Sequence, residues 1–452
     1  MTKTSFMRLA LEEIEQQEIV EQIKQDNQES QQSGEAEQDQ CIADMTNAED
    51  DIAEHLDYIS EVVDDTSDVQ DIADFTEDAQ QEGIDSTTAQ ILDVATESLY
   101  TRLGVRPKVN HYAAEDFGSK TTKVNSTKLA VEGFKEFIKA MWGAIKTAFK
   151  KMSLYLKRYI DLVFDQNTVT IRNANSLRDK IKRTPIDNNN KALLSNEKLE
   201  IVVSNKFFNL SSAESSEAFV FDEQGLKAGE EIVVKTSELI DTFIKYLDKN
   251  SDLKELVENE SNFNSIIYPN LSKSFVSGAK GVYFSKPFIG SRKIQIKTPE
   301  NAQGKTGLDS IVAIEKTSIE LVYSSLSFNN LNSDSNSRYD IAAVNPTTQR
   351  NIIDTVIAVS ERIAKSKSIY TELTLKHDKM INEIDSVEQA AGQKEEEYAQ
   401  YKSRVIHVRT FAKEINRLTS EMITVTSGSL VKSCHAALEI VEQSYSTYLK
   451  YQ

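Results

Sequence analysis

Cysteine, proline, glycine and long apolar runs are all scarce in this chain of 452 residues. The two cysteines, Cys41 and Cys434, are almost four hundred residues apart, which excludes a disulfide framework and a cysteine-based zinc site and fits a reducing compartment. With 15 glycines and 6 prolines, the chain is neither collagenous nor a low-complexity polymer. No apolar run approaches the length of a spanning helix, and residues 1–30 lack the apolar core of a secretion signal. A soluble protein without an export signal is therefore expected.

Patterns that indicate catalysis, cofactors or metals are equally scarce. The histidines lack the spacing of metal ligands; they are His55, His111, His377, His407 and His435. Cys434 and His435 are adjacent, but neighbours on a helix point about 100° apart, so they are not expected to act as nucleophile and base. The tripeptide 304–306 (GKT) is similar to the end of a phosphate loop, yet Pro299 occupies the position of the first glycine. The sequence therefore predicts a non-enzymatic protein that uses no cofactor and no metal.

Charge is abundant, and it is divided between two regions. Residues 1–100 contain 28 acidic and 3 basic residues, a charge of −25, whereas residues 101–183 contain 18 basic and 7 acidic residues, a charge of +11. Because like charges repel and aromatic residues are few, the acidic region is predicted to be largely disordered or loosely helical. It is either a solvated tail or a counter-charge that masks the basic region until it is removed, and charge alone does not choose between these.

Apolar residues inside the acidic region recur at helical spacing, for example at Ile52, Leu56 and Ile59. Short amphipathic helices are therefore expected there. Their other faces carry Glu, Gln and Asp, so such helices would need a partner to be stable.

A long amphipathic helix is predicted in the basic region, over residues 127–164. Apolar residues follow steps of three and four from 131 to 163 and include Trp142, the only tryptophan. A second basic helix is predicted over residues 173–183, ending before Pro185. The face opposite the apolar stripe of the long helix is basic, and its residues are Lys128, Lys135, Lys139, Lys146, Lys150, Lys151, Lys157 and Arg158.

Three interpretations of the long helix remain open. Its apolar stripe could pack on the protein's own C-terminal helices and leave the lysines solvated. Its ammonium groups could neutralise the phosphates of packaged DNA without sequence preference. It could also lie at a bilayer surface with Trp142 inserted, which requires an exposed stripe. The first two are compatible, because a buried stripe leaves the lysine face free.

The rest of the chain predicts an α+β fold. Residues 185–190 are rich in turn formers and are predicted to be a linker, and residues 191–345 are predicted to be a mixed α/β domain. Three apolar-periodic runs within residues 346–452, separated at Gly392 and Gly428, predict a helical bundle on which the long basic helix packs. Strands are expected at 199–203, 219–221, 281–284, 293–297 and 319–323, and helices at 236–247 and 252–259.

Three segments together carry a family resemblance. They are Glu97–Lys108 (ESLYTRLGVRPK), His111–Lys120 (HYAAEDFGSK) and Ser126–Lys150 (STKLAVEGFKEFIKAMWGAIKTAFK). This part of the chain resembles the virion and internal head proteins of large tailed bacteriophages, in which an acidic N-terminal propeptide commonly precedes a segment of this type. The resemblance implies residence inside the phage head, host cytoplasm during assembly, and removal of the propeptide by a maturation protease.

In that family the protease cuts after glutamate in a context of a small residue, any residue and Glu. Ala113, Ala114 and Glu115, followed by Asp116, match this context, as do the segments 95–97 and 130–132. Cutting after Glu115 would remove 29 acidic and 6 basic residues, a charge of −23, and leave a mature chain of charge +4. The predicted layout is therefore an acidic propeptide-like region (1–115), a basic helical neck (116–184), a linker (185–190), a mixed α+β domain (191–345) and a helical bundle (346–452).

The sequence thus predicts a structural protein of the phage head, made as a precursor and cleaved near Glu115. Its expected partners are the capsid or other internal head proteins, the maturation protease and packaged DNA contacted through phosphate. The alternative is a membrane-active or DNA-ejection protein that uses residues 127–164 at a bilayer surface, and a third interpretation is an enzyme housed in residues 191–345.

Overall fold

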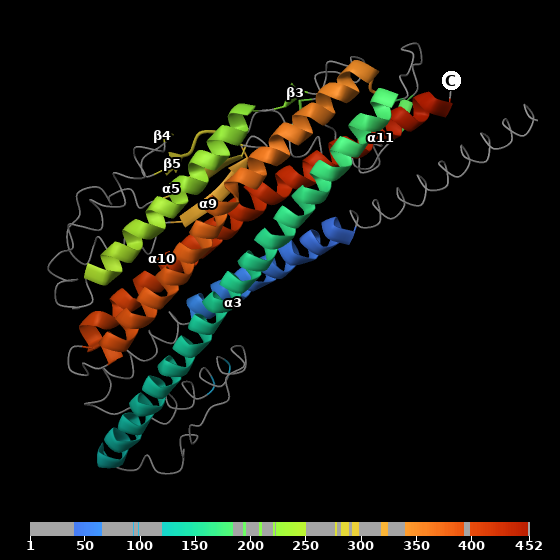
Figure 1. The fold of residues 1–452 in the computed structure, drawn as a ribbon. Helices are drawn as coiled ribbons and strands as arrows, with labels where there is room; N and C mark the ends of the chain where they lie inside the picture. The colour runs from blue at the N-terminus through green and yellow to red at the C-terminus, as the bar shows by residue number, and fades with distance from the viewer. Residues whose placement is uncertain are drawn as a thin grey trace, which may run out of the picture.

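Long helices dominate the described part of the protein (Figure 1). The structure, a computed structural model, describes residues 40–65, 94, 98, 120–183, 193–195, 208–209, 220–221, 223–249, 276–277, 282–288, 292–297, 318–323, 340–392 and 398–450. Its helices are residues 40–65, α3 (Lys120–Arg183), α5 (Glu223–Lys249), α9 (Pro346–Gly392), α10 (Tyr398–Ile423) and α11 (Ser429–Lys450). Together they form an elongated bundle.

Strands make three small antiparallel sheets. A four-stranded sheet has the order β4 (Val276–Ser277), β5 (Val282–Phe284), β6 (Arg292–Lys297) and β7 (Ser318–Tyr323), and β7 lies against α10. The two-stranded sheets are β1 (Leu193–Ser195) with β8 (Asp340–Ala342), and β2 (Phe208–Asn209) with β3 (Val220–Phe221). The described residues are therefore mostly helical, with less β-structure than the α+β prediction implied.

Helix α9 is the element that the other long helices share. It runs antiparallel to α3, because Asp378 pairs with Lys157 near one end and Asp354 with Arg178 near the other. Helix α5 lies on α9 in the parallel direction, with Glu230 paired to Arg362 and Asp241 to Lys376 at 2.6 Å. One continuous cluster of buried apolar side chains joins residues from 45 to 448. Burial of these amphipathic faces is the main stabilising contribution to the bundle.

Two helices continue where the sequence predicted breaks. Helix α3 runs to Arg183 without the separate second helix expected at 173, and it begins at Lys120. The runs expected on either side of Gly428 are joined by a π-helical turn, η2 (Thr424–Gly428), in which the Ser429 amide donates to the Thr424 carbonyl. Helix α10, η2 and α11 are therefore one rod. Packing on almost every side of this rod outweighs the low helix propensity of a single glycine.

Buried polar side chains link the rod to α9 and α3. The fully buried His377 of α9 hydrogen-bonds to Asn416 of α10, and Asn167 of α3 donates to the Ser360 carbonyl of α9 at 2.9 Å. Because the Asn416 amide nitrogen donates to the Ala412 carbonyl, its oxygen faces His377, and Nε2 of His377 carries the proton. The histidine is thus held neutral with a defined tautomer.

Acidification is expected to destabilise the protein through His377. Burial lowers the pKa of His377 below the ordinary value of 6.5, so at lower pH the unfolded chain binds a proton that the folded chain does not. Stability is therefore lost as the pH falls from that value towards the lowered pKa, by up to about 1.4 kcal/mol per pH unit. Urea denaturation at about pH 7.5 and about pH 5.5 measures the loss. The variant His377→Gln keeps a donor for Asn416, and an unchanged pH dependence in this variant would contradict the assignment.

Candidate functional site

The described residues hold no arrangement typical of a catalytic or metal centre. Among them, no group of three or more His, Cys, Asp or Glu side chains is placed to bind a metal ion. Cys434 is buried, and burial raises the pKa of its thiol to about 12, so the thiolate needed for attack does not form near neutral pH. His435 lies 2.9 Å from Glu439, one turn further along α11. In the segments that the structure covers, no helix combines the length and hydropathy needed to cross a bilayer.

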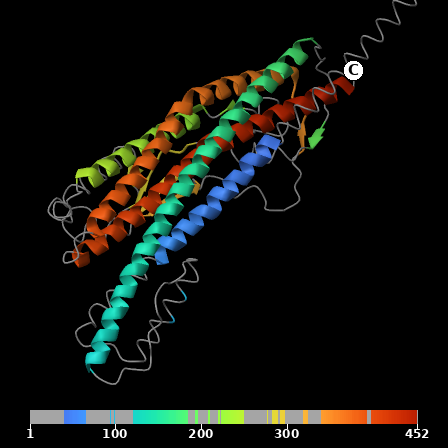
Figure 2. The same ribbon diagram turned by 60° about the horizontal axis from the view of Figure 1, so that its bottom comes forward.

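The acidic helix at residues 40–65 is docked on the body of the protein. It carries nine acidic residues and no Lys or Arg. Figure 2 shows it lying along α3 and beside the rod formed by α10, η2 and α11. Glu49 meets Tyr159 of α3, and His55 meets Ala148 earlier in α3. Glu49 also meets Lys432, and Asp64 meets Lys413 earlier in the rod, so the helix runs antiparallel to both.

The buried face of this helix explains why it docks. Its buried apolar residues are Met45, Ala48, Ile52, Ile59, Val62 and Val63, all within the main core cluster. Apart from the adjacent pair Val62 and Val63, they repeat in steps of three, four and seven, which places them on one stripe. The predicted helical periodicity at Ile52, Leu56 and Ile59 is confirmed here. Residues 40–65 form a continuous helix, for which α3 and the rod supply the partner that the sequence indicated it would need.

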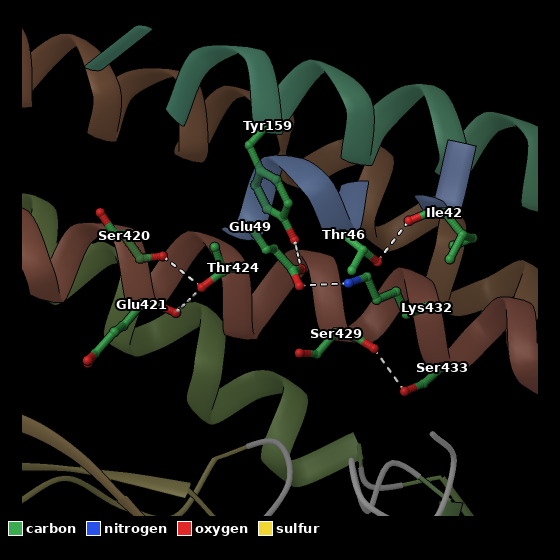
Figure 3. A network of polar contacts seen from close by, with 10 residues as sticks. All are labelled: Ile42, Thr46, Glu49, Tyr159, Ser420, Glu421, Thr424, Ser429, Lys432 and Ser433. Carbon is green, nitrogen blue, oxygen red and sulfur yellow. Dashed lines mark hydrogen bonds and ion pairs between the residues drawn. The ribbon is translucent and has the colours of Figure 1, made fainter. Parts of the chain in front are cut away.

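Glu49 is the polar centre of the docked helix (Figure 3). The hydroxyl of Tyr159 on α3 donates to one carboxylate oxygen, and Nζ of Lys432 on α11 lies 2.7 Å from the other. Tyr159 is fully buried, whereas the side chains of Lys432 and Glu49 are 15% and 28% exposed. Burial, and then the charge of Glu49, hold the pKa of Tyr159 well above its ordinary value, so the phenol stays a donor. Three elements distant in sequence therefore meet at one carboxylate.

Gly428 makes room for this contact. A Cβ at this position would lie 1.6 Å from the Tyr159 hydroxyl oxygen and 3.1 Å from a carboxylate oxygen of Glu49. Gly428 ends the π-helical turn η2, and such turns are frequent at functional positions. The glycine is required here for close approach of a side chain.

Further contacts hold the two ends of the docked helix. His55 lies with Nε2 2.8 Å from the Ala148 carbonyl of α3, and its ring is in edge contact with Tyr155. Lys413 of α10 pairs with Asp64 at 2.8 Å. Beside His55, a cavity of about 490 Å³ is lined from both helices, and it brings acidic and basic side chains together; its lining includes Asp51, Glu54, Gly143 and Lys151.

The structure places some of the residues of the predicted basic face on the surface of α3. Lys150, Lys151 and Arg158 are exposed on α3, and Lys146 is half-buried. Lys157 differs, because it forms an ion pair with Asp378 of α9. For Lys128, Lys135 and Lys139 the structure gives the α3 backbone only, and the predicted cleavage segment, Ala113, Ala114, Glu115 and Asp116, lies outside the described residues. The basic face and the cleavage position thus stay predictions.

The apolar stripe of α3 is buried in its described part. Phe149, Met152, Leu156 and Val163 are at most 1% exposed and belong to the main core. Lipid binding by this stretch would require an exposed stripe, so it would first have to leave the core. Trp142 lies outside the residues whose side chains are described.

The contacts of Glu49 are not predictable from the sequence. Tyr159 is one of many apolar-stripe residues, and Glu49 is one of nine acidic residues in its helix. Only the fold brings both to Lys432, 383 positions further along the chain than Glu49.

Comparison with known proteins identifies the family. Residues 19–443 match the phiKZ-like phage internal head proteins, so the match spans the docked acidic helix, α3 and nearly all of the bundle. No curated protein and no solved structure matches the chain. This family consists of structural proteins of the virion head, in agreement with the resemblance seen in residues 97–150. With most of its length matched, the chain belongs to the phiKZ-like phage internal head proteins.

Proposed function

We propose that this internal head protein is made as a precursor and is cut by a maturation protease after Glu115. In the precursor, the acidic region serves as a counter-charge to the basic helix α3. The mature part then lies in the head beside packaged DNA or neighbouring subunits, with the basic face of α3 towards them.

One observation carries this proposal: an acidic helix from the region to be removed is docked directly on the basic helix. Asp51 and Glu54 line the same cavity as Lys151 of α3. Acidic side chains on the same surface as basic ones lower the positive potential that DNA would meet there. A counter-charge function needs this placement, whereas a solvated tail does not.

The remaining charge supports the second half of the proposal. Cutting after Glu115 separates a segment of charge −23 from a chain of charge +4. Lys150, Lys151 and Arg158 are exposed on α3, and cations on one helix face can neutralise phosphates without reading sequence.

Protein recovered from mature particles tests the cleavage. N-terminal sequencing together with intact mass should give Asp116 as the first residue. The same measurement on particles assembled with the Glu115→Gln variant of this protein should give a longer chain. Finding Met1 in mature wild-type particles would show that this precursor is not processed.

Neutralising the exposed basic residues should weaken DNA association in a salt-dependent way. For the cleaved protein, we expect Lys150→Gln, Lys151→Gln and Arg158→Gln together to lower the slope of log affinity against log salt by about 2 to 3, near 0.9 for each phosphate that is no longer neutralised. Fluorescence anisotropy with a short duplex over a salt series measures the slope. Lys157→Gln is the matched control, because its charge is already paired with Asp378. Equal slopes for the triple variant and wild type would contradict a DNA-facing role for this surface.

A further inference from the structure

We propose that residues 40–65 stay bound to the mature chain after cleavage, as a separate fragment in the groove between α3 and the rod of α10, η2 and α11. The inference rests on the cleavage proposed above and adds a partner to it. In this arrangement the mature protein consists of two non-covalently joined chains.

The position of the cut supports retention. Glu115 lies 50 residues beyond the last residue of the docked helix. The described contacts of the helix are non-covalent and are made with α3, α10 and α11. A cut after Glu115 breaks none of these described contacts.

The connection between the helix and α3 is long. It spans the 54 residues from 66 to 119, and the effective concentration that a tether provides falls as its length increases. Docking of the helix is therefore expected to depend mainly on the contacts of the helix itself.

The contacts themselves oppose release. Six apolar side chains of the helix would return to water, and by itself a helix with nine acidic residues and no Lys or Arg is not stable. Loss of Glu49 would leave the Tyr159 hydroxyl and the Lys432 ammonium without this acceptor in a site from which water is largely excluded. Release thus costs both apolar burial and polar pairing.

Retention changes what cleavage accomplishes. Residues 40–65 carry a charge of −9, so a mature chain of +4 that keeps them remains net acidic. A single cut after Glu115 leaves residues 1–115 as one chain, so release of residues 1–39 and 66–115, each of charge −7, requires further cuts on both sides of the docked helix, which continues to cover its part of α3.

An engineered cut in the full-length protein tests retention directly. The residues 113–116 are replaced by the recognition sequence of a specific protease, the folded protein is cut to completion, and the products are separated by gel filtration at physiological salt. We expect the fragment containing residues 40–65 to elute with residues 116–452 in equal amounts. Elution of the fragment as a separate species, with the body still folded by circular dichroism, would overturn the proposal.

Two matched double variants show whether the described interface holds the cut fragment on the body of the protein. Ile52→Asn with Ile59→Asn places amides on the buried face and should reduce the co-eluting fragment at least tenfold. Asp50→Asn with Asp57→Asn introduces the same residue on the exposed face and should leave co-elution unchanged. Equal retention of both would show that the fragment is held elsewhere.

Mass spectrometry of purified mature particles separates this inference from the cleavage itself. Peptides from residues 40–65 together with an N-terminus at Asp116 support both proposals. An N-terminus at Asp116 without those peptides upholds cleavage and contradicts retention in the particle. An N-terminus at Met1 contradicts cleavage, and the engineered cut then still decides whether the helix binds as a separate chain.

Discussion

Replacement of Gly428 by alanine is expected to lower the free energy of unfolding by about 2 to 5 kcal/mol. The new Cβ would lie 1.6 Å from the Tyr159 hydroxyl oxygen and 2.8 Å from the ring carbon that bears it. The ring cannot simply swing away, because Tyr159 is fully buried between helices. Either the ring and the docked helix are displaced together, or the rod shifts, and both break the hydrogen bond to Glu49. Urea denaturation followed by circular dichroism measures the loss.

Gly143 supplies the matched control for this prediction. It is an exposed glycine in α3, and a Cβ there would meet nothing within 4 Å. Gly143→Ala should therefore stabilise the protein slightly, by up to about 1 kcal/mol, through the better helix propensity of alanine. Tyr159→Phe removes the atom closest to the new Cβ, so it should partly rescue Gly428→Ala. Equal effects of the two alanine variants would mean that Gly428 is not needed for close approach.

Replacement of Glu49 by alanine is expected to cost about 1 to 3 kcal/mol, with the value reduced from that of a fully buried pair because Glu49 is partly exposed. The substitution removes the acceptor of the Tyr159 hydroxyl and the counter-ion of Lys432 in one step. Glu49→Gln should cost less, since an amide oxygen still accepts from Tyr159 while the ion pair is lost. Thermal and urea denaturation of the full-length protein give both values.

Asp50 is the control for Glu49, as it is the next residue, has the same charge and is exposed. Asp50→Ala should change stability by no more than about 0.5 kcal/mol. A similar loss in the Asp50 and Glu49 variants would indicate a general effect of helix charge rather than the specific contact. A loss confined to Glu49 would support its role as the anchor of the acidic helix.

The mainly helical architecture could be predicted because its determinants are local. Steps of three and four between apolar residues predict α3, α9, α10 and α11 without reference to any tertiary contact. Four of the five expected strands correspond to β3, β5, β6 and β7, and the fifth, at 199–203, lies outside the described residues. The helix expected at 236–247 is longer, because α5 begins at Glu223.

The errors at helix ends have a shared cause. Gly428 was expected to separate two helices, and a break in the long basic helix was expected between residues 164 and 173. Both expectations weigh local propensity alone. Tertiary packing adds more stabilisation than one glycine or a few β-branched and polar residues remove, so the helices continue.

By itself, the sequence determined the separation of acidic and basic segments, the positions of the long helices and a resemblance that the family match later established. These follow from composition, periodicity and local motifs. Only the tertiary structure decided that residues 40–65 are docked, that Lys157 is paired with Asp378, and that Glu49, Tyr159, Gly428 and Lys432 meet. Such contacts join residues more than a hundred positions apart, and no local pattern encodes which acidic residue will reach which partner.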